Sequence, residues 1–161
     1  MLIDYLADHP GFIDQLSPLL VAQWRDVIPE DTVAARSAKL QQHLNRDRLP
    51  VAWVAHDAGQ VQGIAALRAT DLHGREDLTP WLGGVFVADE FRGRGIGEAL
   101  CRRVEHEARS LGFTTLYLFT LDKQRWYAKQ GWQIHTPGDW RGMPGDIMSR
   151  VLVAPGPPDG S

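Results

Sequence analysis

Residues 91–100 read FRGRGIGEAL, in which three glycines and two arginines stand directly before a run of helix-forming residues. Glycine tolerates a positive φ, which lets successive backbone N–H groups converge on one ligand. The first turn of the following helix adds unpaired N–H donors and a partial positive charge. The stretch therefore predicts a phosphate site at residues 92–97, where Arg92 and Arg94 add charges that suit a pyrophosphate.

Two other phosphate-binding motifs do not fit this stretch. A P-loop requires a Gly-Lys pair, and the chain contains none. The dinucleotide fingerprint G-x-G-x-x-G fails because Glu98 stands where its third glycine belongs, which disfavours a nucleotide-binding module. The pattern that does fit is R-x-x-G-x-G, formed by Arg92, Gly95 and Gly97.

The segments on either side of this loop alternate between strand and helix signals. Two glycines interrupt an apolar run at residues 81–88, which is typical of a bulged strand or a close backbone approach. Apolar residues recur every three to four positions from Ile96 to Leu111 and predict a helix. The uniformly apolar residues 114–120 predict a strand that is covered on both faces.

Other elements complete a mixed α/β fold with a central mixed sheet, one bulged strand and flanking helices. We expect helices over 10–25, with a break or kink at Pro18, and over 30–46, a hairpin over 51–69, a short helix near 122–130 and a closing strand pair. One domain is expected over residues 1–153, followed by a disordered tail at residues 154–161.

The chain resembles the GNAT superfamily of acyl-CoA-dependent N-acyltransferases. The features that carry the resemblance follow one another in order: the bulged strand, the R-x-x-G-x-G loop, its helix, the apolar strand and the segment WYAKQGW at residues 126–132. The resemblance is strongest over residues 80–135. It implies that the loop holds the pyrophosphate of acetyl-CoA, that the bulged strand pairs with the pantetheine arm, and that the next strand diverges. The cosubstrate contacts it implies are Val85, Phe86, Val87, Arg92, Gly93, Arg94, Gly95, Ile96, Gly97 and Thr120.

An amine that attacks a thioester needs a base, stabilisation of the oxyanion and a proton for the departing thiolate. Tyr127 occupies the position where the family commonly carries its general-acid tyrosine. A phenol has an ordinary pKa of about 10, above the value of about 8.5 for a thiol, so it delivers a proton only as charge develops on sulfur. Backbone N–H groups at the bulge, such as those of Val85 or Phe86, are candidates for the oxyanion hole.

The base is less well defined, because many family members carry a carboxylate on the bulged strand and residues 80–87 contain none. Asp77 on the preceding loop is the candidate base, acting directly or through water. Its alternatives are Asp71, His73 and Glu76 on the same loop.

Trp81 and Trp140 border the bulged strand and the last hairpin loop, where an amine acceptor would lie. The expected reaction is acetyl transfer to a primary amine of a small molecule or peptide, by direct attack in a ternary complex. The missing strand carboxylate leaves open a non-catalytic acyl-CoA-binding regulatory module.

Composition limits the remaining alternatives. The net charge of −3 argues against a nucleic-acid partner, and no apolar run has the length of about 18 residues that a spanning helix needs. The single Cys101 excludes an internal disulfide, and the acidic start lacks secretory features, so we expect a cytoplasmic protein. We expect it to be a monomer or a homodimer. None of the six histidines has the spacing of a metal motif, so we expect no metal.

Overall fold

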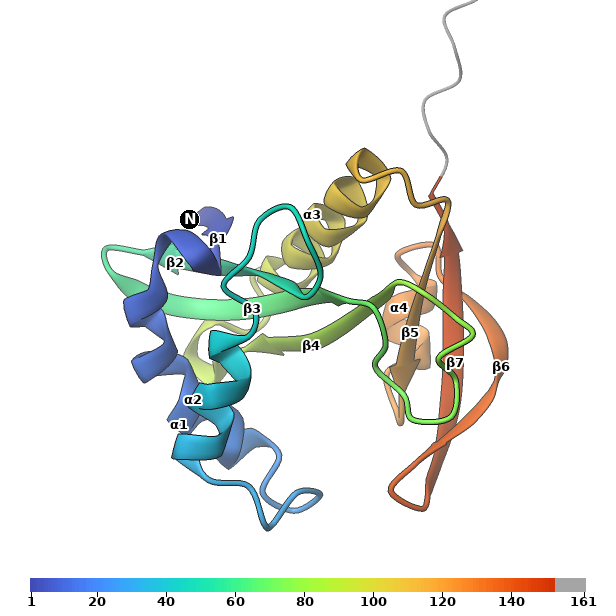
Figure 1. Cartoon of the computed structure of the whole chain (residues 1–161), viewed down its shortest axis with the longest axis horizontal. Helices are drawn as coiled ribbons and strands as arrows, with labels where there is room; N and C mark the ends of the chain where they lie inside the picture. Colours follow the sequence, from blue (N-terminus) through green and yellow to red (C-terminus); the bar gives the residue numbers. More distant parts are fainter. Residues whose placement is uncertain (153–161) are drawn as a thin grey trace, which may run out of the picture. The chain divides into compact units, whose positions relative to one another are not determined.

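A computed structural model describes residues 1–152 of the chain, and its elements are labelled in Figure 1. The contacts divide the chain into a first unit, residues 1–67 and 84–101, and a second unit, residues 68–83 and 102 onward. Within residues 1–152 the seven strands are hydrogen-bonded in the order β1-β2-β3-β4-β5-β7-β6, which confirms the mixed α/β class. The single domain stays a prediction, and the tail at 154–161 lies outside the described residues.

Three strands of the first unit form an antiparallel meander. Strand β1 (Leu2–Tyr5) pairs with β2 (Val51–Asp57), and β2 pairs with β3 (Gln60–Arg68). Ala58 and Gly59 connect β2 to β3 with φ values of 50° and 78°. Two successive positive φ values are those of a two-residue hairpin turn, so the predicted hairpin is confirmed.

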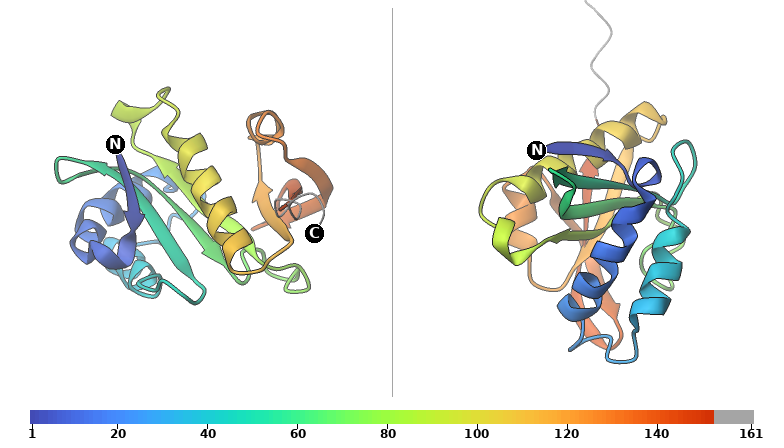
Figure 2. Two further views of the ribbon diagram at one scale, coloured as in Figure 1. Left: turned by 90° about the horizontal axis from the view of Figure 1, so that it is seen from above. Right: turned by 90° about the vertical axis from the view of Figure 1, so that its left-hand side faces the viewer.

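Two α-helices of this unit, α1 (Ile13–Gln23) and α2 (Val33–Gln41), lie side by side (Figure 1 and Figure 2). Single 3₁₀ turns at Leu6–Asp8 and Pro10–Phe12 precede α1. Helix α1 continues through Pro18, so of the two expected effects of this residue, a break or a kink, the break does not occur. The hydroxyls of Ser17 and Ser37 join the two helices at 2.7 Å.

The apolar core of the first unit lies among its strands and helices. Gly63 marks its tightest packing, because an added Cβ would lie 2.6 Å from the Phe86 carbonyl oxygen and 3.1 Å from a Leu100 methyl group. The buried residues of this core are Leu6, Ile13, Leu16, Leu20, Leu40, Ala52, Val54, Val61, Ile64, Ala66, Phe86 and Ala88.

Parallel pairing in the second unit joins β4 (Trp81–Val87) to β5 (Thr115–Thr120), with Trp81 opposite Tyr117. The predicted parallel arrangement is confirmed, whereas the divergence of these strands stays a prediction. Strand β7 (Met143–Val151) runs antiparallel to β5 and to β6 (Gln133–Trp140).

The side chains of β5 alternate between half-buried and buried, so only one of its faces is fully covered, contrary to expectation. The less covered face carries Tyr117 and Phe119, which pack at the edge of an aromatic cluster instead of inside it. This cluster is built on the buried Leu72, Trp81 and Ile147.

Three helical elements remain, namely a 3₁₀ turn at Asp89–Phe91, helix α3 (Ile96–Ser110), which contributes to both units, and α4 (Gln124–Ala128) in the second. None of the helices within residues 1–152 combines the length and the apolar character that a membrane crossing requires.

Candidate functional site

The glycine loop in the first unit has the backbone conformation that its sequence predicts. Gly93 and Gly95 are exposed and adopt φ values of 77° and 80°. Helix α3 begins at Ile96, and its first turn closes when the Ala99 N–H donates to the Gly95 carbonyl at 3.1 Å. The N–H groups at the start of such a helix have no carbonyl partner within it. An exposed loop with these donors suits a phosphate group.

The Arg92 guanidinium contacts three groups of the protein, and its expected role as a pyrophosphate contact stays a prediction. Its Nε donates to the Val87 carbonyl at 2.9 Å, and its Nη2 donates to the Gln23 side chain at 3.0 Å. Its Nη1 lies 2.8 Å from the Asp89 carboxylate. The guanidinium therefore ties the loop to the end of β4 and to the end of α1. Arg94 is exposed, and its guanidinium lies 5.5 Å from the centre of the Phe91 ring.

Strand β4 carries the irregular backbone that its paired glycines predict. Gly84 has a φ of 61°, which departs from extended geometry. At Gly83 an added Cβ would lie 2.8 Å from Nη1 of Arg68 and 2.9 Å from the Asp71 carboxylate, so a side chain there would have to displace these two groups. Further along the strand, Phe86 is buried in the first-unit core, whereas Val85 and Val87 are half-buried.

Tyr127 lies in the second unit on α4, where two tryptophans hold its ring. The ring meets Trp126 edge-on with centroids 4.8 Å apart, and it meets Trp132 in the same way at 6.1 Å. The N–H of Trp132 donates to the Tyr127 carbonyl at 3.2 Å and fixes the chain that follows the helix. The side chain is half-buried, so these contacts leave part of it accessible.

Thr120, an expected cosubstrate contact at the end of β5, is buried. Its hydroxyl oxygen accepts a hydrogen bond from the Lys123 N–H at 2.9 Å. The side chain therefore stabilises the turn that leads from β5 into α4.

Asp77, the candidate base, forms a two-point ion pair with Arg75. The Arg75 Nε and Nη2 donate to its two carboxylate oxygens at 3.0 and 3.1 Å. These hydrogen bonds are the largest cause of a lowered pKa for Asp77. A lowered pKa makes a carboxylate a weaker base, so the geometry gives Asp77 little basicity.

The two tryptophans expected near the acceptor differ in exposure. Trp81 is fully buried, and its indole N–H donates to the Leu78 carbonyl at 2.6 Å. Trp140 is half-buried and packs against the cluster that contains Trp81. The structure thus brings these two residues together, with Trp140 as the accessible one.

His135 was missed in the sequence, because a lone histidine on a strand carries no signal. Its ring meets Tyr117 edge-on at 5.5 Å, and Tyr117 lies 6.0 Å from Trp81. Its charge also contributes to the lowered pKa of Asp77. His135 is the smallest of the causes of that lowered pKa, and its ring contact with Tyr117 is its main contact with the cluster.

Comparison with known proteins identifies related sequences. The family described as acetyltransferase (GNAT) domain matches residues 49–134, more than half of the chain. An amino-acid acetyltransferase from Ralstonia nicotianae is 28% identical over 134 residues, which cover 83% of this chain. The chain spans only 26% of the length of that relative.

Solved structures share the fold. An aminoglycoside 6′-acetyltransferase type Ii matches with a TM-score of 0.77 at 24% identity, over 96% of this chain and 99% of its own. An aminoglycoside 6′-N-acetyltransferase complexed with coenzyme A gives 0.75 at 22% identity, over 96% and 98%. N-acetylglutamate synthase from Neisseria gonorrhoeae, with coenzyme A and N-acetyl-glutamate, gives 0.68 at 18%, over 96% of this chain and 36% of its own.

Proposed function

Because this chain belongs to the GNAT acetyltransferase family, we propose that it transfers an acetyl group from acetyl-CoA to a primary amine of a small molecule or peptide. The observation that carries the proposal is the loop at residues 92–97, with two glycines at positive φ directly before α3. A coenzyme A complex among the structures of the same fold supports the choice of donor.

The residues of the loop fit the pyrophosphate of coenzyme A. The backbone of Gly93, Gly95, Ile96 and Gly97 supplies donors, and nothing stands within 4 Å of a Cβ built at Gly93. Arg92 holds the loop through the Val87 carbonyl, and Arg94 supplies positive charge beside it. The loop therefore binds mainly through its backbone, with Arg92 as a positioning residue.

In the chemical step the amine nitrogen bonds to the thioester carbonyl carbon, and the carbon–sulfur bond then breaks. Backbone N–H groups of Val85 or Phe86 stabilise the oxyanion. The phenol of Tyr127 gives its proton to the departing sulfur and regains a proton from solvent. Its ring is already oriented by Trp126 and Trp132, which reduces the entropy lost in reaching that geometry.

Asp77 remains the proposed base, acting through a water molecule. Its ion pair with Arg75 lowers its pKa, so its contribution is smaller than that of a carboxylate placed on the strand. Solvent deprotonates a fraction of the acceptor before it binds. The proton that the nitrogen still loses as the amide forms passes to the water held by Asp77.

The acceptor amine is proposed to bind beside Trp140, over the cluster that includes Trp81. An aromatic face attracts a cationic or partly charged amine, and Asp77 adds a negative charge on the loop. The relatives named for amino-acid and aminoglycoside acetylation make these two classes of small amine the first to test.

The test is amine-dependent release of coenzyme A. Purified protein is given acetyl-CoA with a panel of amino acids, aminoglycosides and short peptides, and free thiol is followed with a thiol reagent. We expect at least one amine to accelerate thiol release and to gain one acetyl group by mass spectrometry. Binding of acetyl-CoA with no acceleration by any amine in the panel would support the non-catalytic module instead.

A further inference from the structure

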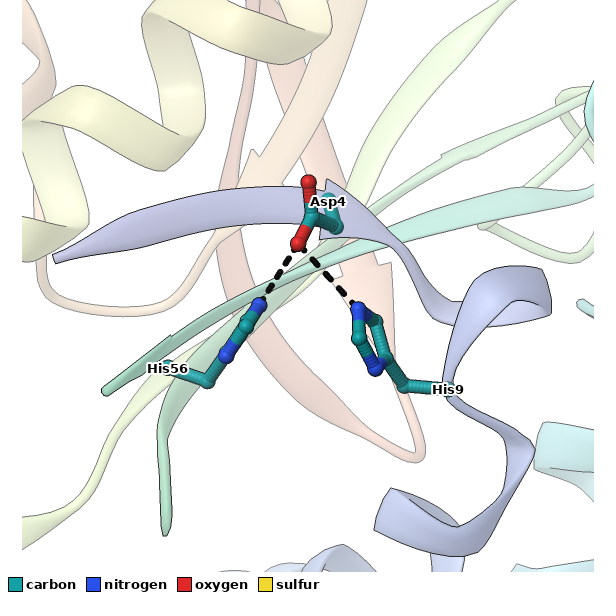
Figure 3. A group of neighbouring side chains, drawn as sticks. All are labelled: Asp4, His9 and His56. Atoms are coloured by element: carbon teal, nitrogen blue, oxygen red, sulfur yellow. Dashed lines mark hydrogen bonds and ion pairs between the residues drawn. The ribbon is translucent and has the colours of Figure 1, made fainter. Parts of the chain in front are cut away.

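Asp4, His9 and His56 form a cluster in the first unit, outside the residues assigned to acetyl transfer (Figure 3). The Asp4 Oδ2 atom lies 2.7 Å from Nε2 of His56 and 3.1 Å from Nε2 of His9. One ligand atom from each side chain lies within 4.8 Å of the other two. Among residues 1–152, no other group of three or more His, Cys, Asp or Glu side chains is gathered in this way.

We propose that this cluster binds one divalent cation of the zinc type. Zinc takes imidazole nitrogens and carboxylate oxygens at about 2.0–2.1 Å, which places tetrahedral donors about 3.3 Å apart. The separations of 2.7 and 3.1 Å between Asp4 and the two histidines need only a small opening to reach that value. Two imidazoles with one carboxylate favour zinc or cobalt over magnesium or calcium, which prefer oxygen donors alone.

The register of β1 with β2 explains why these residues meet. Leu2 stands opposite His56, and side chains alternate along a strand, so Asp4 projects from the same face as His56. The 3₁₀ turn at Leu6–Asp8 then reverses the chain, with the His9 N–H bonded to the Leu6 carbonyl at 2.9 Å. The site thus joins two strands and the segment that leads into α1.

Exposure and packing suit a site that is anchored on one side and open on the other. The His56 side chain is only 8% exposed, whereas those of Asp4 and His9 are 38% and 34% exposed. The Phe12 ring stacks on His9 with centroids 4.9 Å apart and lies 5.1 Å from the His56 ring. An apolar ring beside two ligands orients them and limits competition from water.

Cation binding replaces the two hydrogen bonds to Asp4. A neutral imidazole that donates through Nε2 moves its proton to Nδ1, and a doubly protonated imidazole releases one proton to solvent. Three protein ligands leave a fourth position for water. Because the cation links β1, β2 and the start of the α1 segment, its role is to stabilise the first unit.

The experiment uses the full chain without a polyhistidine tag, stripped of metal by a chelator. Cobalt(II) is titrated while its visible absorption is recorded, and zinc is then added as a competitor. We expect one equivalent of cobalt to bind, zinc to displace it, and zinc to raise the melting temperature. His9→Ala and Asp4→Asn should each weaken binding by at least about 100-fold.

His106→Ala is the matched control, because His106 is an exposed histidine on the second-unit part of α3 and is not one of the three residues of the cluster. This variant should bind cobalt as the wild type does. Circular dichroism establishes that each variant is folded. His9→Ala and Asp4→Asn remove different ligands, so each variant tests the site without the other. An absence of saturable binding in the wild type would overturn the proposal, as would wild-type affinity in folded His9→Ala or Asp4→Asn.

Discussion

Tyr127 is the residue on which the proposed chemistry most depends. Tyr127→Phe removes only the phenol oxygen, and the ring keeps its contacts with Trp126 and Trp132. Negative charge on sulfur develops only as the carbon–sulfur bond breaks, so the loss should fall on kcat and leave acetyl-CoA affinity unchanged. We expect kcat to fall by about 10²- to 10⁴-fold.

The measurement compares kcat and calorimetric acetyl-CoA affinity for wild type, Tyr127→Phe and Tyr5→Phe. Tyr5 is a tyrosine of the first unit that has no assigned role, so its variant should keep the wild-type kcat. A Tyr127→Phe enzyme with unchanged kcat would make Tyr127 a packing residue.

Individual residue roles were the least predictable feature of the chain. The motif predicts that Arg92 faces a phosphate, which stays a prediction, but it does not predict that the guanidinium donates to the carbonyl of Val87 and to Gln23, a residue distant in sequence. Asp4 and His56 lie close together because of the register between β1 and β2, and the spacing of residues along the sequence does not reveal that register. By contrast, the positive φ values of Gly93 and Gly95 follow from local backbone preference.

Helix α2 has a side-chain N-cap, Thr32, which a single substitution removes. The hydroxyl oxygen of Thr32 accepts a hydrogen bond from the Ala35 N–H at 3.0 Å. Thr32→Ala leaves that donor without its partner and should lower the free energy of unfolding by about 1 kcal/mol. Urea unfolding measures the loss, and Thr32→Ser, which retains a hydroxyl, should recover most of it. Equal stability of Thr32→Ala and wild type would show that water replaces the cap.

Glu105 on α3 gives the second unit a pH-dependent stability. Its side chain is 7% exposed and lies 2.5 Å from Nε of Arg150 on β7. Burial raises its pKa above the ordinary 4.5, while the positive charge of Arg150 acts in the opposite direction. The folded state therefore holds this proton more tightly than the unfolded state. This contribution to stability is present below pH 4.5 and is lost as the pH rises through the raised value.

The Glu105→Gln variant has an amide in place of the carboxyl group, so its side chain does not ionise as the pH rises. We expect the stability of this variant, relative to wild type, to increase as the pH rises above 4.5. Urea unfolding of both proteins across this range measures the difference. A difference that does not change with pH would mean that the ion pair with Arg150 fully offsets the effect of burial.

Elements were predictable where the local pattern is strong. The glycine loop and α3 follow one another as expected, because apolar spacing and backbone preference agree there. Around Pro18 the proline signal predicts an interruption, with a penalty of about 3 kcal/mol or more. Helix α1 nevertheless continues, because Leu16 and Leu20 on it are buried in the first-unit core.

For the whole molecule, the order of elements indicated the family, which the match over residues 49–134 confirms. The fold class was predictable because each element carries its own signal. Trp140 was predicted as an acceptor contact and His135 was not, and both reach the aromatic cluster through the pairing of β6 with β7 and β7 with β5. Such contacts between distant segments leave no local pattern.

Coenzyme A binding by the loop at residues 92–97 is the central claim, and titration calorimetry of wild type against Gly95→Asp tests it most directly. The variant puts a negative charge and a strained side chain at φ 80° in the phosphate site. Gly112→Asp is the matched control, with a φ of 93° and the same charge change just beyond the other end of α3. We predict one bound coenzyme A per wild-type chain, wild-type affinity in Gly112→Asp and a loss of about 100-fold or more in Gly95→Asp. A folded Gly95→Asp protein that binds coenzyme A as tightly as wild type would contradict the account.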